Sequence, residues 1–233
     1  MTSRRDISKP TAGVPDAKSD VARFLERAAT IKPASGETGR LVFALDATMS
    51  RQPTWDAACQ LQAEMFDEVG RIGSLAVQLV YYRGYGECRA SKWVSDTASL
   101  RDLMIGLQVR GGRTQIGKVL THVRREGQKH RVNALVFVGD AMEEVVDELA
   151  HRAGELGLTG VPAFMFQEGR DAVTEQAFRE IARLSNGAYM RFDQGAAREL
   201  ARLLRAVAKY AAGGRRALAD GSVTERRLLE QLK

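Results

Sequence analysis

The chain has 233 residues, of which 44% are hydrophobic and 27% are charged, and its net charge is +6. This composition is typical of a soluble globular protein, and the length is sufficient for one sizeable hydrophobic core. Two cysteines exclude a disulfide-rich scaffold, and no apolar stretch approaches the length of a membrane span.

The cysteines and the first residues also indicate a compartment. Cys59 falls in an expected helix and Cys88 in an expected strand, and we expect both to be buried thiols in a reducing environment. The start of the chain, MTSRRDISKP, lacks the apolar core of a secretory signal peptide. We therefore expect a cytoplasmic protein.

Composition divides the chain into four parts. Residues 1–18 are polar and contain two prolines, which is typical of a disordered segment. Residues 19–39 are expected to form a short helix and a linker, and residues 40–212 a single domain. Residues 213–233 are expected to be an extension with one short helix.

Two apolar runs, LVFAL at 41–45 and ALVFV at 134–138, have no alternation of polar residues. Strands that are buried on both faces have this pattern, so a parallel sheet covered by helices is expected. Further strands are expected at 75–82, 87–93, 161–166 and 188–192, with a tight turn in YYRGYGEC between the first two. Helices are expected at 55–69, 97–108, 143–156, 174–184 and 200–211, and directly after Thr114. The pattern predicts a doubly wound α/β domain: a mostly parallel central sheet with one antiparallel edge strand and helices on both faces.

Side chains that carry oxygen lie directly after the two apolar runs and after a glycine pair, where the chain is expected to be at one edge of the sheet. Asp46, Thr48 and Ser50 follow the first apolar run, Thr114 follows a pair of glycines, and Asp140 ends the second run. Ligands of open α/β sheets bind at the carboxyl ends of the strands, so we expect the three segments to meet there. Hydroxyl and carboxylate oxygens suit Mg²⁺ or Mn²⁺. The alternative is that each of these residues only caps a helix.

Five further residues are expected on the same edge, where they would form a surface for a partner. Arginine and tyrosine are favoured in interface hot spots, and arginines add long-range attraction for an acidic surface. The predicted partner-binding residues are Arg51, Arg83, Tyr85, Arg113 and Arg170.

At these residues the chain resembles the von Willebrand factor type A (VWA) domain family. That family has a metal-ion-dependent adhesion site with the pattern Asp-x-Ser-x-Ser, a distant Thr and a distant Asp, which Asp46, Thr48 and Ser50, then Thr114, then Asp140 match. The first hydroxyl here belongs to a threonine, and the sequence around Asp140 is Gly-Asp-Ala where the family usually has Thr-Asp-Gly. The resemblance covers residues 40–211 and implies a Rossmann-like VWA fold.

The resemblance also implies a function. In the family the hydroxyls bind the metal directly, the aspartates often reach it through water, and an open position accepts an Asp or Glu of a partner. The chain would then be a divalent-cation-dependent protein-binding module and not an enzyme. Cytosolic members often act beside AAA+ ATPases or in larger assemblies.

Two other functions stay open at the level of sequence. Basic residues crowd positions 110–131, which raises the alternative of a nucleic-acid-binding module, although a solvated helix face is favoured. A strand-end aspartate with magnesium also allows a metal-dependent phosphohydrolase. The three histidines, His122, His130 and His151, lie outside the candidate loops, so no general base is evident for that reaction.

Overall fold

The fold is known from a computed structural model. It describes residues 39–54, 75–95, 99, 102, 104, 106–192, 206, 207 and 211. The expected segments 1–18 and 213–233, the short helix and linker apart from residue 39, the helix at 55–69 and most of the helices at 97–108 and 200–211 lie outside the described residues.

The described elements alternate between strands and helices, as the sequence pattern predicts. The strands are β1 (Gly39–Asp46), β2 (Leu75–Arg83), β3 (Glu87–Ala90), β4 (Ala134–Gly139), β5 (Ala163–Glu168) and β6 (Ala188–Phe192). The helices are η1 (Met49–Thr54), α4 (Ile116–Lys129), α5 (Val146–Leu158) and α6 (Ala172–Leu184).

The strands form one six-stranded sheet in the order β3-β2-β1-β4-β5-β6. All neighbours pair in parallel except β2 and β3, which form an antiparallel hairpin at one edge. This confirms the predicted fold class, with a mostly parallel sheet and one antiparallel edge strand.

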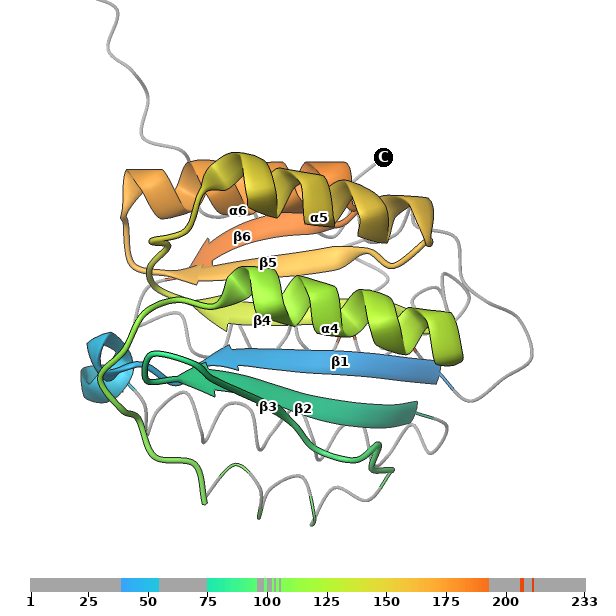
Figure 1. The fold of residues 1–233 in the computed structure, drawn as a ribbon, viewed down its shortest axis with the longest axis horizontal. Helices are drawn as coiled ribbons and strands as arrows, with labels where there is room; N and C mark the ends of the chain where they lie inside the picture. Colours follow the sequence, from blue (N-terminus) through green and yellow to red (C-terminus); the bar gives the residue numbers. More distant parts are fainter. Residues whose placement is uncertain are drawn as a thin grey trace, which may run out of the picture.

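Both faces of the sheet are covered. Successive side chains of the central strands point to opposite faces, and both sets are buried. Helices α4, α5 and α6 lie on one face, as Figure 1 shows, and pack on a core that includes Val42, Ala44 and Phe137. The alternate residues Phe43 and Val136 belong to the other core, on which the helical residues Met104, Ala206, Val207 and Ala211 pack. Within the described part of the chain, no helix is both long and apolar enough to span a bilayer.

Two predicted boundaries are wrong by three residues, more than the others. Strand β3 ends at Ala90 and not at residue 93, because the Ser91 hydroxyl accepts the hydrogen bond of the Leu79 amide (3.0 Å) that a continuing ladder would give to a backbone carbonyl. Helix α5 begins at Val146 and not at residue 143. The two glutamates that precede it, Glu143 and Glu144, have other partners that are described below.

The strand order places the candidate residues. The chain runs outward from β1 to β3 on one side and from β4 to β6 on the other, so the order reverses between β1 and β4. Ligands of open α/β sheets bind in the crevice at this reversal, beyond the carboxyl ends of the strands. Asp46 is the last residue of β1, and Asp140 directly follows β4.

Candidate functional site

The first loop is organised around the carboxylate of Asp46, which is fully buried at the end of β1. Its Oδ1 accepts a hydrogen bond from the backbone amide of Thr48 (2.8 Å), and its Oδ2 accepts one from the hydroxyl of Tyr82 on β2 (2.8 Å). The Thr48 Oγ1 lies 3.0 Å from the Ser50 Oγ. Thr48 is buried and Ser50 is exposed, so the two hydroxyls connect the buried carboxylate to the surface.

Burial makes this carboxylate costly to ionise. Loss of solvation raises the pKa of Asp46, the hydrogen bonds from Thr48 and Tyr82 lower it, and the charge of Asp140 raises it again. Burial and the neighbouring Asp46 also raise the pKa of Tyr82 well above its ordinary value, so its hydroxyl stays protonated as a donor. The two aspartates are thus close enough to repel each other, and a cation between them would remove that repulsion.

The second loop contributes Asp140. Its Oδ1 is buried and has no hydrogen-bond partner among the described residues. Glycine precedes it at the end of β4, where a Cβ on Gly139 would lie 3.4 Å from the Cβ of Asp46. Asp140 does not cap α5, because the N-cap of that helix is Val145. A buried carboxylate oxygen without a donor is unusual in a folded protein and needs an explanation.

The third loop reaches the same edge by pairing with the first. Arg110 forms a parallel bridge with Thr48, and its amide donates to the Ala47 carbonyl (3.0 Å). Thr114 then meets the Asp140 loop: its Oγ1 accepts from the Glu143 amide (3.0 Å), and its own amide donates to the Glu143 carboxylate (3.3 Å). The three predicted segments therefore lie at one edge of the sheet.

The alternative that Thr114 caps the following helix is wrong, because the N-cap of α4 is Gln115 and has no side-chain bond. The first turn of α4 is satisfied from another loop instead. The Glu144 carboxylate accepts from the amides of Ile116 and Gly117. Sequence reasoning placed Glu143 and Glu144 in the first turn of α5. The structure shows that Glu143 holds Thr114 and that Glu144 holds the first turn of α4, so residues 107–115 (the threonine loop) are fixed to the loop after Asp140.

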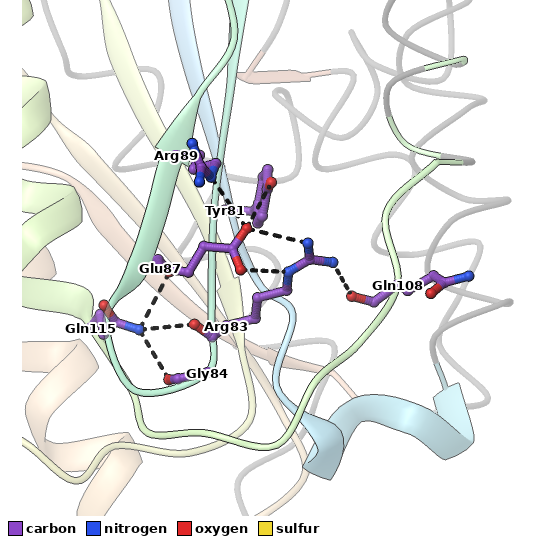
Figure 2. A network of polar contacts seen from close by, with 7 residues as sticks. All are labelled: Tyr81, Arg83, Gly84, Glu87, Arg89, Gln108 and Gln115. Atoms are coloured by element: carbon purple, nitrogen blue, oxygen red, sulfur yellow. Dashed lines mark hydrogen bonds and ion pairs between the residues drawn. The ribbon is translucent and has the colours of Figure 1, made fainter.

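The β2–β3 hairpin holds the other side of the threonine loop, as Figure 2 shows. Arg83 at the end of β2 pairs with Glu87 at the start of β3 (Nε to Oε2, 3.0 Å) and donates to the Gln108 carbonyl (2.8 Å). The same glutamate accepts from Tyr81 and Arg89. The guanidinium of Arg83 is therefore engaged within the domain and is partly buried, so it is not the freely exposed partner contact that the sequence predicted.

Gln115 continues this network beside the hairpin turn (Figure 2). Its Nε2 donates to the carbonyls of Arg83 (3.3 Å), Gly84 (3.2 Å) and Glu87 (3.4 Å). The backbone amide of Arg113 also donates to the Gly84 carbonyl (3.2 Å). The hairpin turn thus determines where Thr114 lies.

The prediction that Arg51 contacts a partner is wrong. Arg51 lies in η1, five residues after Asp46, and its side chain is fully buried. Its guanidinium pairs with Glu168 at the end of β5 (3.0 Å) and its Nη1 lies 3.4 Å from the Val138 carbonyl of β4. Arg51 therefore fixes the first loop to the ends of β4 and β5, and cannot reach a partner.

Three predicted partner residues are on the surface. Tyr85 in the hairpin turn is 86% exposed, and Arg113 and Arg170 are also exposed. Two exposed apolar side chains lie at the same edge: Met49, the first residue of η1, and Val145, before α5. The edge therefore combines cationic, aromatic and apolar exposed groups around the three loops.

The chemistry of the three loops fits a hard cation. All five side chains present oxygen, and one buried oxygen of Asp140 has no hydrogen-bond donor. Among the described residues, these loops included, no group of three or more His, Cys, Asp and Glu side chains could hold a metal ion. A site here would depend on two carboxylates and three hydroxyls, which favours Mg²⁺ or Mn²⁺ over Zn²⁺.

Comparison with known proteins agrees with the fold. No known family model matches the sequence, and no curated protein matches it. Among solved structures, a von Willebrand factor type A protein from Catenulispora acidiphila has a TM-score of 0.62 at 16% identity, over 80% of this chain and 47% of that one. Proximal thread matrix protein 1 of the mussel byssus has a TM-score of 0.61 at 14% identity, over 76% and 47%.

The VWA domain of SpRpn10 is similar over nearly its full length. Its TM-score is 0.55 at 16% identity, and the match covers 72% of this chain and 94% of that domain. The chain spans less than half the length of the first two structures. Sequence identity this low is evidence about fold and not about activity. The chain contains a domain with the von Willebrand factor type A fold.

Proposed function

We propose that the domain is a protein-binding module that depends on a divalent cation, Mg²⁺ or Mn²⁺. Asp46, Thr48, Ser50, Thr114 and Asp140 would hold the ion. The observation that carries the proposal is the buried Oδ1 of Asp140, which has no donor among the described residues and lies beside a second carboxylate. A cation is the group that would satisfy both features at once.

The residues around the site orient the proposed ligands and supply no further carboxylate to the ion. Tyr82 and the Thr48 amide hold the Asp46 carboxylate in one orientation, and Glu143 holds Thr114 beside the Asp140 loop. Two carboxylates roughly balance a divalent charge, and the nearby Glu143 and Glu144 are engaged with backbone amides. A bound ion would supply an electrophilic position for a carboxylate of another protein.

The partner should therefore present an acidic residue within a mixed surface. Tyr85, Arg113 and Arg170 would contact its polar rim, and Met49 and Val145 its apolar groups. Arginines near the site would also speed encounter with an acidic surface. An AAA+ ATPase or a larger assembly is the kind of partner that the family resemblance suggests.

Direct measurement of Mn²⁺ binding tests the proposal. Mn²⁺ should bind saturably to the wild-type chain, as measured by electron paramagnetic resonance of free Mn²⁺, and Asp140→Asn should abolish this binding. Asp147→Asn is the matched control, because it removes the same charge from an exposed residue in the first turn of α5. The metal site is wrong if wild type binds no Mn²⁺ at millimolar concentration or if Asp140→Asn binds as wild type does.

A thermal measurement gives an independent readout. A ligand that binds only the folded state stabilises it by about 2.7 kcal/mol at one hundred times its dissociation constant. Mn²⁺ should raise the melting temperature of wild type and of Asp147→Asn, and leave that of Asp140→Asn unchanged. An equal rise in all three would indicate binding elsewhere.

A further inference from the structure

A cavity of about 340 Å³ lies away from the candidate metal site, between α4 and the edge hairpin. None of the five proposed metal ligands lines it. Its polar side chains come from α4 and α5, namely Lys118, Thr121, His122, Arg125 and Arg152. The spacing of the α4 members places them on one side of the helix, facing the hairpin.

The lining is strongly cationic. Lys118, Arg125 and Arg152 supply three cationic side chains, and none of the nine residues that line the cavity is aspartate or glutamate. Val80, Cys88 and Ala90 supply an apolar wall from the edge strands. A hollow of this volume is large enough for a small ligand, and its mainly polar lining favours a charged one.

Only part of this charge is balanced. Arg152 lies 3.7 Å from Glu148, whereas the Arg89 side chain pairs with Glu87 (3.3 Å) on the opposite face of the hairpin. Within the described part of the chain, neither Lys118 nor Arg125 forms an ion pair with a carboxylate. The cavity therefore has two cationic groups whose charge is available to an anion.

Several of the polar groups are already held in place. The Lys118 Nζ donates to the Gly86 carbonyl (3.1 Å) and to the Gln115 Oε1 (2.7 Å), which fixes it over the hairpin turn. Arg152 donates to the Thr121 hydroxyl (2.7 Å) and to the Gly117 carbonyl (3.1 Å). Side chains that are ordered before binding lose less entropy when a ligand arrives.

We propose that this cavity binds a small phosphorylated anion. Lys118 and Arg125 contact the phosphate oxygens, Thr121 and Arg152 extend the polar wall, and the apolar wall of Val80 and Ala90 contacts the rest of the molecule. Ammonium and guanidinium groups form strong charge-assisted hydrogen bonds with phosphate. From the sequence, the basic residues around α4 were either a solvated helix face or a nucleic-acid site. In this proposal, some of them form a small-ligand site instead.

Titration with inorganic pyrophosphate tests the proposal. Calorimetry on the full chain, in metal-free buffer of low ionic strength, should show saturable binding of one pyrophosphate. Lys118→Gln/Arg125→Gln should weaken it by at least about tenfold, since charge-assisted contacts are lost. The matched control is Lys92→Gln/Arg131→Gln, which removes two exposed positive charges outside the cavity and should change affinity less than about twofold.

A second measurement locates the anion. Cys88 lines the cavity, so saturating pyrophosphate should slow its alkylation by iodoacetamide, as followed by peptide mass spectrometry. The proposal is wrong if wild type shows no saturable binding, if the two double variants weaken binding equally, or if alkylation of Cys88 is unchanged at saturation. It is also wrong if a single-stranded oligonucleotide binds to this face and pyrophosphate does not compete with it.

Discussion

Asp46 shows how a single buried residue can be prepared for a ligand. Its carboxylate is fully buried, and two donors, the Thr48 amide and the Tyr82 hydroxyl, stabilise its charge only in part, because burial still raises its pKa. The sequence identifies Asp46 from its place after an apolar run. It does not identify Tyr82, because that residue reads as part of the hydrophobic strand β2.

Tyr82→Phe should lower the free energy of unfolding by about 1–3 kcal/mol, because it leaves a buried carboxylate oxygen without its donor. The comparison is Tyr81→Phe, whose hydroxyl lies 3.3 Å from Glu87, a carboxylate that keeps two arginine partners. Urea denaturation should show the larger loss for Tyr82→Phe. Equal losses would contradict the importance of the bond to Asp46.

Arg51→Met should cost about 3–5 kcal/mol of stability, because Glu168 would be left as a buried, unpaired charge. The double variant Arg51→Met/Glu168→Gln should recover part of this loss, since the remaining group is neutral. Urea denaturation of the three proteins measures both effects. If Arg51→Met unfolds within about 1 kcal/mol of wild type, the buried pair does not fix the first loop as described.

At the scale of elements, the threonine loop is positioned by two neighbours that are distant in sequence. The β2–β3 hairpin holds it through the contacts of Arg83 and Gln115, and the loop before α5 holds it through Glu143 and Glu144. The glycine pair before Thr114 allows the backbone of this loop to lie directly against the hairpin turn. A Cβ on Gly112 would lie 2.1 Å from the Gly84 carbonyl oxygen, whereas one on Gly111 would meet nothing within 4 Å.

Gly112→Ala should therefore separate the hairpin from the threonine loop and destabilise the domain by about 1–3 kcal/mol. Gly111→Ala is the matched control and should change stability by less than about 0.5 kcal/mol. Thermal denaturation compares the two, and Mn²⁺ binding should weaken in Gly112→Ala alone. Equal behaviour of the two variants would show that the close approach to Gly84 does not position the loop.

At the scale of the whole molecule, stability should fall on acidification partly through His122. Burial lowers the pKa of this histidine, which lies on α4 with a ring nitrogen 2.8 Å from the Gln78 Oε1 of β2. Nearby Glu126 opposes that shift, and Lys129 and Arg125 add to it. Because the unfolded chain binds the proton more readily, stability decreases as the pH falls below about 6.5 towards the folded-state pKa.

His122→Gln should therefore lose less stability than wild type between pH 7 and pH 5, since glutamine keeps a polar contact to Gln78 and does not titrate. His151→Gln, at an exposed position on α5, serves as the control for the substitution itself. Urea denaturation across this pH range measures the slopes. A slope for His122→Gln as steep as that of wild type would assign the acid sensitivity to other groups.

The topology connects these scales. The reversal of strand order between β1 and β4 places Asp46 and Asp140 at the ends of neighbouring strands, although they are 94 positions apart in the sequence (140 − 46). The antiparallel hairpin at the edge then reverses the chain direction. As a result, Arg110 in the loop after residue 106 can form its parallel bridge with Thr48. The same hairpin, together with α4 and Arg152 of α5, lines the basic cavity.

The sequence by itself determined the fold class, the six strands and the segments that carry the candidate ligands. Those features depend on local patterns: apolar runs that end in aspartate, and glycines before a threonine. It also predicted that the edge strand is antiparallel, because a short glycine-containing turn allows no crossover. Whether the five oxygen ligands bind a metal stays a prediction.

Only the tertiary structure decided which polar residues are buried and which are free. Arg51 and Arg83 read as surface cations in the sequence, yet Arg51 is paired with Glu168, 117 residues away, and Arg83 with the hairpin and the Gln108 carbonyl. Glu143 and Glu144 were expected in the first turn of α5, but they precede that helix and bind Thr114 and the first turn of α4. Residue spacing specifies a face of a helix or strand, but the partner of a polar side chain depends on which distant segment packs against it.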